Sequence, residues 1–308
     1  MVLKLGKIKL KNKGILAPML EYTNLSFRQL CAKNNCALTY TEMIHASYIL
    51  NSSIEEIENK TKDEDYPVSL QLVGDFTNSK ETKEAFFKVQ EIKAYDVIDF
   101  NLGCPSPKIA VGKGGAILLN NISEVSKTLK QIKEISSKPI TAKIRLGYDK
   151  DNSKDIIKKL EWSGIDALAI HGRLGIQDYS VPSDYKRVIS LAKETSLPMI
   201  YNGDITLDTA DFFKDIDEFD GLMVGREALK NPSIFSKISG TKQRTTEESI
   251  SLFLKFSKKY NNSIINQKLV LLQLLSGFKG ARQLRAKLTT LKTQEEIDLF
   301  LEKYKIQD

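Results

Sequence analysis

The sequence predicts an α/β fold, a (β/α)8 TIM barrel followed by a small all-helical domain. Eight short runs rich in β-branched residues alternate with longer helical patterns over roughly the first 240 residues, which is typical of parallel strands joined by helices. After Asn231-Pro232 the pattern changes to helices alone. A doubly wound sheet is the alternative, but no GxGxxG fingerprint opens the first unit, and this favours the barrel.

Each predicted strand is a short apolar run, and each predicted helix has apolar residues at helical spacing. The strands span residues 14–19, 37–43, 67–73, 97–101, 140–145, 167–172, 199–203 and 221–225. The helices between them span residues 25–34, 79–93, 123–135, 153–162, 183–194 and 207–214, and several begin at a Ser or Asn that can cap a helix. With 308 residues, 41% of them hydrophobic, the chain can bury such a core.

The C-terminal part is predicted to be a bundle of helices. Residues 247–260, 267–275, 281–288 and 294–304 show apolar residues at helical spacing. Ser239-Gly240-Thr241 is the expected junction, because small and polar residues interrupt the pattern there. We therefore expect a catalytic barrel over residues 1–240 and a helical domain over residues 241–308.

Positive charge is concentrated in the predicted helical domain. Residues 241–308 carry 13 Lys and Arg against 7 Asp and Glu, a net charge of +6 out of +7 for the whole chain. A basic, solvated helix surface is one explanation. A surface that binds a polyanion is the other, and the nearly neutral barrel beside it favours this second explanation.

The cysteine and histidine content excludes two classes of site. Three cysteines without CxxC spacing and two histidines fit neither a disulfide scaffold nor a zinc site, so we expect no metal. The N-terminus has lysines scattered among apolar residues, unlike a signal peptide, and no apolar run reaches membrane-spanning length. We expect a cytoplasmic protein that needs neither a membrane nor an obligatory protein partner.

Polar residues gather at the ends of the predicted strands, where a TIM barrel has its active site. In chain order these ends carry Pro18, Met19, Glu42, Gln71, Asn101, Cys104, Lys143, Arg145, His171, Arg173, Asn202, Gly203, Asp204, Gly225 and Arg226. Each alone has a structural explanation, but burial would cost about 1 to 3 kcal/mol for every polar group left unpaired. We therefore expect them to face a common polar ligand.

The last two strand ends indicate a cofactor that carries a phosphate. Asn202-Gly203-Asp204 and Gly225-Arg226 lie where this fold often binds phosphate, and Arg226 offers a two-pronged donor. Lys143 and His171 could then reach the polar edge of a flavin ring. There they would stabilise the negative charge of its reduced form.

Cys104 follows an apolar run that ends at Asn101, and it stands between Gly103 and Pro105. A free cysteine chosen at random is more often a small buried residue. Here the neighbouring glycine and proline favour a thiol presented from a loop at a strand end. From the residues alone it could be a nucleophile, a ligand or an acid.

Eight segments together resemble the tRNA-dihydrouridine synthases, FMN-dependent enzymes that reduce specific uridines in tRNA to dihydrouridine. They are APMLEYTNLSFRQLC, YTEM, LQLVGD, DFNLGCPSPKIAVGKGGAILL, AKIRLG, AIHGR, YNGDI and MVGREALKNP, within residues 14–235. The motifs NxGCP, KIRxG, HGR and NGDI occur in the family's order, so the resemblance is specific.

The resemblance implies a role for each matching residue. Cys104 corresponds to the general acid that protonates C5 of the uracil while the flavin N5 delivers a hydride to C6; a thiol, mostly protonated near neutral pH, suits an acid. The residues that correspond to cofactor contacts are Pro18, Met19, Gln71, Lys143, His171, Asn202, Gly203, Asp204, Gly225 and Arg226. Asn101, Arg145 and Tyr179 correspond to residues that hold the target uracil, which must leave the base stack.

The resemblance also implies NADPH as reductant and tRNA as partner, held by the helical domain. The segment FKGARQLRAKL is similar to the family's closing motif. The chain departs from the family at KLVLLQLLSGF, which replaces a histidine-containing helix, and at Leu174, where many relatives have threonine. We expect these departures to affect tRNA contacts rather than the chemistry.

Two other functions are compatible with parts of the sequence. A flavin barrel similar to dihydroorotate dehydrogenase would act on a free pyrimidine, but a small substrate needs no basic helical domain. A non-catalytic RNA-binding barrel would have no use for Cys104 or the phosphate-site residues. The sequence therefore predicts an FMN-dependent oxidoreductase, a tRNA-dihydrouridine synthase.

Overall fold

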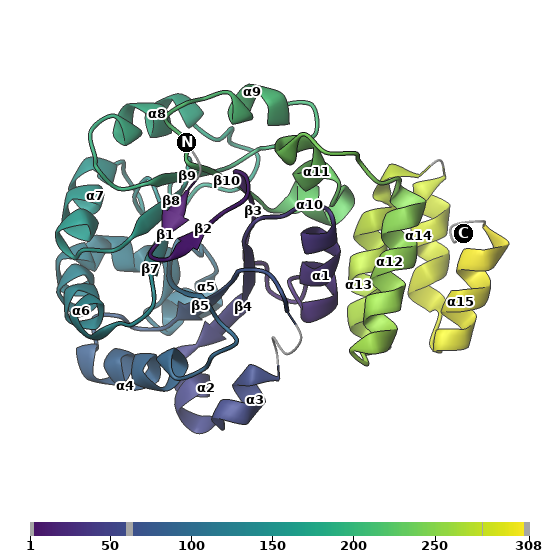
Figure 1. The fold of residues 1–308 in the computed structure, drawn as a ribbon, viewed down its shortest axis with the longest axis horizontal. Coiled ribbons are helices and arrows are strands. Elements are labelled where there is room, and N and C mark those ends of the chain that lie inside the picture. Colours follow the sequence, from purple (N-terminus) through teal and green to yellow (C-terminus); the bar gives the residue numbers. More distant parts are fainter. Residues whose placement is uncertain (1–2, 60–63, 279, 305–308) are drawn as a thin grey trace.

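The computed structural model describes residues 3–59, 64–278 and 280–304, and its centre is a barrel of eight parallel strands (Figure 1). The strands are β3 (Gly14–Leu16), β4 (Thr39–His45), β5 (Val68–Val73), β6 (Val97–Leu102), β7 (Ile140–Arg145), β8 (Ala167–His171), β9 (Met199–Asn202) and β10 (Gly221–Val224). Their order is β3-β10-β9-β8-β7-β6-β5-β4. A bridge between Ile15 and Leu38 joins β3 to the start of β4 and closes the barrel. The predicted TIM barrel is confirmed.

Helices surround the barrel, because parallel strands need crossover connections. They are α1 (Leu25–Lys33), α2 (Ala46–Asn51), α3 (Ile54–Glu58), α4 (Ser79–Gln90), α5 (Pro107–Val111), α6 (Ile122–Ile135), α7 (Ser153–Trp162), α8 (Tyr185–Ala192), α9 (Ala210–Lys214), α10 (Arg226–Lys230) and α11 (Ile234–Ser239), with a 3-10 helix, η1 (Gly115–Asn121), before α6. The sequence analysis missed α2, α3, α5, α10 and α11. These helices have five or six residues and show little helical period. Helix α9, also five residues long, was predicted as a longer helix over residues 207–214.

A short antiparallel hairpin, β1 (Lys4–Leu5) and β2 (Ile8–Lys9), precedes the barrel and was not predicted. Its buried Leu5 and the neighbouring Leu3 and Leu10 pack in one cluster with Ile15 and Val97 inside the barrel. Val97 is the first residue of β6, so the hairpin packs at the amino ends of the strands. The hairpin therefore closes that end of the barrel with apolar side chains.

The C-terminal helices form a separate layer beside α1 (Figure 1). They are α12 (Thr246–Lys259), α13 (Ile264–Leu274), α14 (Ala281–Thr290) and α15 (Gln294–Lys303), with a 3-10 turn, η2 (Leu275–Gly277), after α13. Gln29 Nε2 of α1 donates a hydrogen bond of 3.2 Å to the Tyr260 hydroxyl. The expected junction around Gly240 falls between α11 and α12, and the division at residue 240 stays a prediction. Among the described helices, none combines the length and apolar character needed to cross a membrane.

Candidate active site

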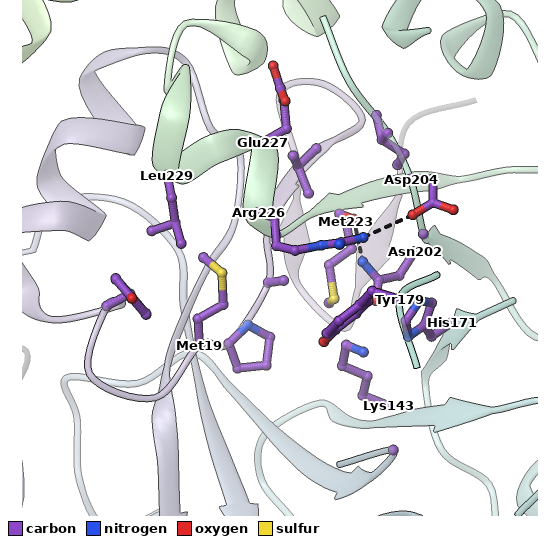
Figure 2. A pocket seen from close by; sticks show the side chains of 18 of the residues that line it. Met19, Lys143, His171, Tyr179, Asn202, Asp204, Met223, Arg226, Glu227 and Leu229 are labelled. Atoms are coloured by element: carbon purple, nitrogen blue, oxygen red, sulfur yellow. Dashed lines mark hydrogen bonds and ion pairs between the residues drawn. The ribbon is translucent and has the colours of Figure 1, made fainter. Parts of the chain in front are cut away.

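A cavity of about 790 Å³ opens at the carboxyl ends of the barrel strands (Figure 2). Parallel strands direct their carboxyl ends to one face, so residues far apart in sequence meet there. Of the residues given a role by the family resemblance, all except Gln71 line the cavity, namely Pro18, Met19, Asn101, Cys104, Lys143, Arg145, His171, Tyr179, Asn202, Gly203, Asp204, Gly225 and Arg226. Glu42 and Arg173, which were also expected at the strand ends, do not line it; Glu42 lines a second pocket.

The loop after β6 holds Cys104 at the cavity wall. Asn101 Oδ1 accepts hydrogen bonds from the backbone N–H groups of Gly103 at 3.1 Å and Cys104 at 2.9 Å. On the other side, the Cys104 carbonyl accepts from the N–H of Ala116 at 2.8 Å. Gly115 has φ +72°, and a Cβ there would lie 2.5 Å from the Cys104 carbonyl oxygen. The partly exposed thiol is thus held by contacts on both sides of its backbone.

Two cations from β7 lie at the centre of the cavity. Burial, together with the charge of Arg145, lowers the pKa of Lys143 to about 8, although Asp99 opposes this change. Arg145 donates from Nε to the Gly103 carbonyl at 3.1 Å and from Nη1 to the Gln177 carbonyl at 2.8 Å. It therefore joins the loops after β6 and β8, and its Nη2 forms no hydrogen bond with the described residues.

His171, at the end of β8, is a neutral ring. Arg173 Nη1 lies 2.8 Å from His171 Nε2, and because the guanidinium can only donate, the ring carries its proton on Nδ1. Burial and the surrounding cations, Lys143 first among them, lower the pKa of His171 to about 2. The Tyr179 ring stacks on the imidazole, with a centroid distance of 6.1 Å. His171 can therefore donate from Nδ1 without carrying charge.

A cationic cluster forms the end of the cavity next to β9 and β10. Asp204 accepts from Arg173 at 2.6 Å. It also accepts from Arg226 at 3.0 Å, as Figure 2 shows. Burial opposes the ionisation of this carboxyl, but the hydrogen bond from Arg173 and the two positive charges hold the pKa of Asp204 below its usual range. The Arg226 guanidinium also lies 4.0 Å from the centroid of Tyr179. Two guanidinium groups against one carboxylate leave a net positive charge, which suits a phosphate.

The residues that line the cavity are of the kinds that can hold the flavin mononucleotide expected from the sequence. Pro18 and Met19 give it an apolar wall, and the Met19 N–H is fixed by the Thr23 hydroxyl at 3.1 Å. Lys143 supplies a cation in the middle, and the cationic cluster lies at one end. Few, well-placed polar groups on an otherwise apolar surface are typical of cofactor sites.

Gln71 lies behind the cavity rather than on its wall. Its side chain is fully buried, with Nε2 donating to Asp99 and Oε1 accepting from Asn101. A flavin contact was expected for this residue. In the structure its amide bonds to Asp99 and Asn101, and Gln71 is not among the described residues that line the cavity.

Sequence reasoning did not assign a role to Asp99, Arg173, Gly115 or Gln273. Asp99 gave a signal, because it is a carboxylate inside the apolar run of β6, and Arg173 stood at a predicted strand end. Gln273 lines the cavity from α13, so the helical domain reaches the site. No local pattern could show this, since the contact depends on how the two parts pack together.

Comparison with known proteins identifies the family of this chain. The model of the dihydrouridine synthase (Dus) family matches residues 15–307. A probable tRNA-dihydrouridine synthase of Aquifex aeolicus is 31% identical over 289 residues, which cover 89% of this chain and 90% of the relative. tRNA-dihydrouridine synthase B of Pseudomonas aeruginosa is 33% identical over 243 residues, covering 77% of this chain and 72% of the relative.

Solved structures support the fold. The old yellow enzyme from Trypanosoma cruzi superposes with a TM-score of 0.60 at 13% identity, over 84% of this chain and 96% of that one. Morphinone reductase superposes with a TM-score of 0.56 at 13% identity, over 82% of this chain and 91% of that one. At such low identity these matches establish the barrel architecture alone. The family model and the relatives go further, and the chain belongs to the dihydrouridine synthase family.

Proposed function

We propose that this chain is a tRNA-dihydrouridine synthase in which Cys104 protonates C5 of a flipped-out uracil. Family membership gives the class of reaction, a flavin-dependent reduction of uridine in tRNA. The observation that carries the residue assignment is the meeting of Cys104, Lys143, His171 and Arg226 in one cavity. These residues come from four different strand ends, and a purely structural role would not require them to face the same space.

The cofactor proposed for this cavity is FMN, with NADPH as the reductant. Arg226 and the backbone around Gly203 and Gly225 would hold the phosphate. Lys143 and the Nδ1–H of the neutral His171 would stabilise negative charge on the ring. When bound and reduced, the flavin supplies the hydride that C6 of the uracil accepts.

Cys104 supplies the proton that completes the reduction. As C6 gains the hydride, the C5=C6 π bond breaks and its electron pair takes the thiol proton at C5, while the electron pair of the S–H bond remains on sulfur. Solvent then returns a proton to the thiolate. Asn101 and Gly115 hold the backbone of Cys104 on either side, so the thiol has a defined position relative to the cavity.

Three residues on the wall can hold the uracil. Asn101 has one amide N–H beyond its bond to Gln71, and Arg145 has Nη2 beyond its three carbonyl bonds; both groups can donate to uracil carbonyls. Tyr179 is 55% exposed, so its ring offers a face for stacking. Aromatic stacking on an extruded base contributes about 1 to 3 kcal/mol.

The helical domain is proposed to bind the tRNA body. It carries most of the net positive charge of the chain, and phosphate contacts of this kind are independent of sequence. Gln273 of α13 lines the cavity, so an RNA lying on this domain would reach the cavity mouth. A free pyrimidine would need no such surface.

The test is to incubate the purified protein with unmodified tRNA and map dihydrouridine, using NADPH in one series and chemically reduced flavin in another. We expect reduction by the wild type in both series. In Cys104→Ala we expect a loss of roughly 100-fold to 10,000-fold in the rate, the range for a missing general acid.

Three results would contradict the proposal. Reduction of uridine monophosphate without reduction of any tRNA would favour an enzyme for free pyrimidines. Full activity in Cys104→Ala would remove the proposed acid. Activity with reduced flavin but with neither NADPH nor NADH would remove the nicotinamide reductant and leave the reaction on uracil intact.

A further inference from the structure

Asp99 is a buried carboxylate in the middle of β6, inside the barrel. Its side chain is fully buried, and burial raises its pKa to about 6, against the hydrogen bonds from Gln71 and Thr141 and the charge of Lys143. Its Oδ1 accepts from the Thr141 hydroxyl at 2.6 Å and its Oδ2 accepts from Gln71 Nε2 at 2.7 Å. It does not line the cavity, so the proposed chemistry gives it no direct role.

A chain of hydrogen bonds leads from Asp99 to the backbone of Cys104. Gln71 Nε2 donates to Asp99, and Gln71 Oε1 accepts from Asn101 Nδ2 at 2.8 Å. Asn101 Oδ1 then accepts from the Cys104 N–H at 2.9 Å. We call this chain, Asp99 to Gln71 to Asn101, the amide relay.

The direction of the amide relay is set at its buried end. An ionised carboxylate only accepts hydrogen bonds, so Gln71 must present its NH2 group to Asp99 and its oxygen to Asn101. Asn101 must then turn its NH2 group toward Gln71 and its oxygen toward the N–H of Cys104. Either amide flipped would place two donors or two acceptors together in a buried site, at a cost comparable to a lost hydrogen bond.

We propose that Asp99 is a positioning residue whose carboxylate fixes the direction of the amide relay and thereby the position of the Cys104 thiol in the cavity. This inference rests on the proposed function for its catalytic consequence, but not for its structural part. Asp99 has a second route to the site, because its charge acts on Lys143. The experiment must therefore separate the amide relay from that electrostatic effect.

The structural readout is the alkylation of Cys104 by iodoacetamide in protein without flavin or tRNA. All three cysteines lie in the described part of the chain; Cys31 and Cys36 are buried and Cys104 is partly exposed, so labelling reports on Cys104. The rate is measured from pH 7 to pH 10. Its high-pH plateau reports access to the thiol, and its midpoint reports the charges around it.

Four variants separate the effect of the amide relay from the effect of the Asp99 charge on Lys143. Asp99→Leu removes the acceptor, Asp99→Asn keeps one acceptor oxygen, and Gln71→Leu breaks the amide relay but keeps Asp99 beside Lys143. Thr141→Val is the matched control, since it removes a buried hydrogen bond to the same carboxylate outside the amide relay. Thermal unfolding followed by circular dichroism confirms that each variant is folded.

For Asp99→Leu and Gln71→Leu we expect plateau rates that differ from the wild type by roughly threefold to tenfold, the factor that corresponds to one lost hydrogen bond. We expect Asp99→Asn to recover most of the wild-type rate and Thr141→Val to stay within about twofold. A wild-type plateau in both leucine variants would overturn the proposal. A changed midpoint in Asp99→Leu, with a wild-type profile in Gln71→Leu, would show that Asp99 acts through Lys143 and would overturn it too.

A second readout uses the reaction in two halves. In Gln71→Leu, which keeps Asp99 beside Lys143, we expect reduction of the bound flavin by NADPH to stay within about twofold, while oxidation of the reduced flavin by tRNA slows by roughly tenfold or more. A loss of equal size in both halves would indicate a general disturbance and contradict the positioning role. If the wild type oxidises no flavin with tRNA but the labelling follows the amide relay, the proposed function fails and the structural inference stands.

Discussion

The two ends of the barrel are built from the same strands but have opposite chemistry. Along β6, the alternate residues Val97, Asp99 and Asn101 pass from an apolar cluster, through a buried carboxylate, to the cavity wall. Along β8, Ala167 and Ala169 belong to the same apolar cluster, whereas His171 lines the cavity. One end of each strand thus stabilises the barrel and the other end carries the site, which is the division expected for this fold.

The difference between the two ends predicts which substitutions change stability and which change function. Changes in the apolar cluster should lower the free energy of unfolding and spare the chemistry at permissive temperature. Changes at the cavity should impair the chemistry and leave the free energy of unfolding nearly unchanged. Changes at Asp99, which lies between the two ends of β6, should alter both the free energy of unfolding and the function.

The largest effect on stability is expected at the closed end. Leu5 is fully buried, so Leu5→Ala should lower the free energy of unfolding by about 3 kcal/mol, with the flavin affinity unchanged below the melting transition. Urea unfolding measures this. Leu20→Ala is the control, because Leu20 is 54% exposed at the cavity end. Equal losses in the two variants would remove the distinction between the ends.

Removing the negative charge of Asp99 should stabilise the folded protein above pH 6. The pKa of Asp99 is raised to about 6 from 3.8, so stability from this group is fully present below pH 3.8 and is lost as the pH rises through 6. At pH 8 the ionised carboxylate therefore costs the folded protein on the order of 2 to 3 kcal/mol. We expect Asp99→Asn to unfold at higher urea concentration than the wild type at pH 8, with the advantage shrinking toward pH 4. A variant less stable than the wild type at pH 8 would contradict this.

At the open end, Arg226→Gln should weaken FMN binding without unfolding the protein. The lost charge-assisted hydrogen bond corresponds to about 1 to 2 kcal/mol, or roughly tenfold in the dissociation constant. Quenching of flavin fluorescence gives the affinity. Lys237→Gln removes the same charge from the next helix, α11, at a residue that does not line the cavity, and should have a smaller effect; equal effects would mean that net charge alone binds the phosphate.

The smallest effect concerns acid stability. The pKa of His171 is lowered to about 2, so below pH 6.5 the unfolded chain binds a proton at residue 171 that the folded chain does not. The free energy of unfolding should therefore fall between pH 6.5 and pH 5, and His171→Gln should reduce that fall by about 1 kcal/mol. Urea unfolding at several pH values measures it. His45→Gln tests the other histidine of the chain. A free energy of unfolding that depends less on pH in that variant alone would assign the effect to His45 rather than to His171.

Much of the architecture could be predicted from the sequence. All eight barrel strands were predicted within a few residues, because each is an apolar run bounded by turn residues. Helices α7 and α12 were similarly clear, since their apolar faces repeat at helical spacing. The hairpin β1–β2 was missed because strands of two residues have no period to detect.

The candidate site, like the fold, could be predicted only in part. The residues at the strand ends could be predicted, because the fold places all such ends on one face. The partners of these residues could not. Gln71 bonds to Asp99 and Asn101 across neighbouring strands, and Arg145 spans the loops after β6 and β8; such contacts depend on register and on loop paths.

Apolar periodicity and local motifs were enough to predict the barrel, the family and most of the residues that line the cavity, although Gln273 was missed and Gln71 does not line it. What each polar side chain bonds to follows from the folded structure. It made His171 a neutral donor, tied Arg226 to Asp204, and linked Asp99 to the loop that carries Cys104. The physical reason is that hydrogen bonds and buried charges depend on distances between strands and on local dielectric, and these exist only after the chain has folded.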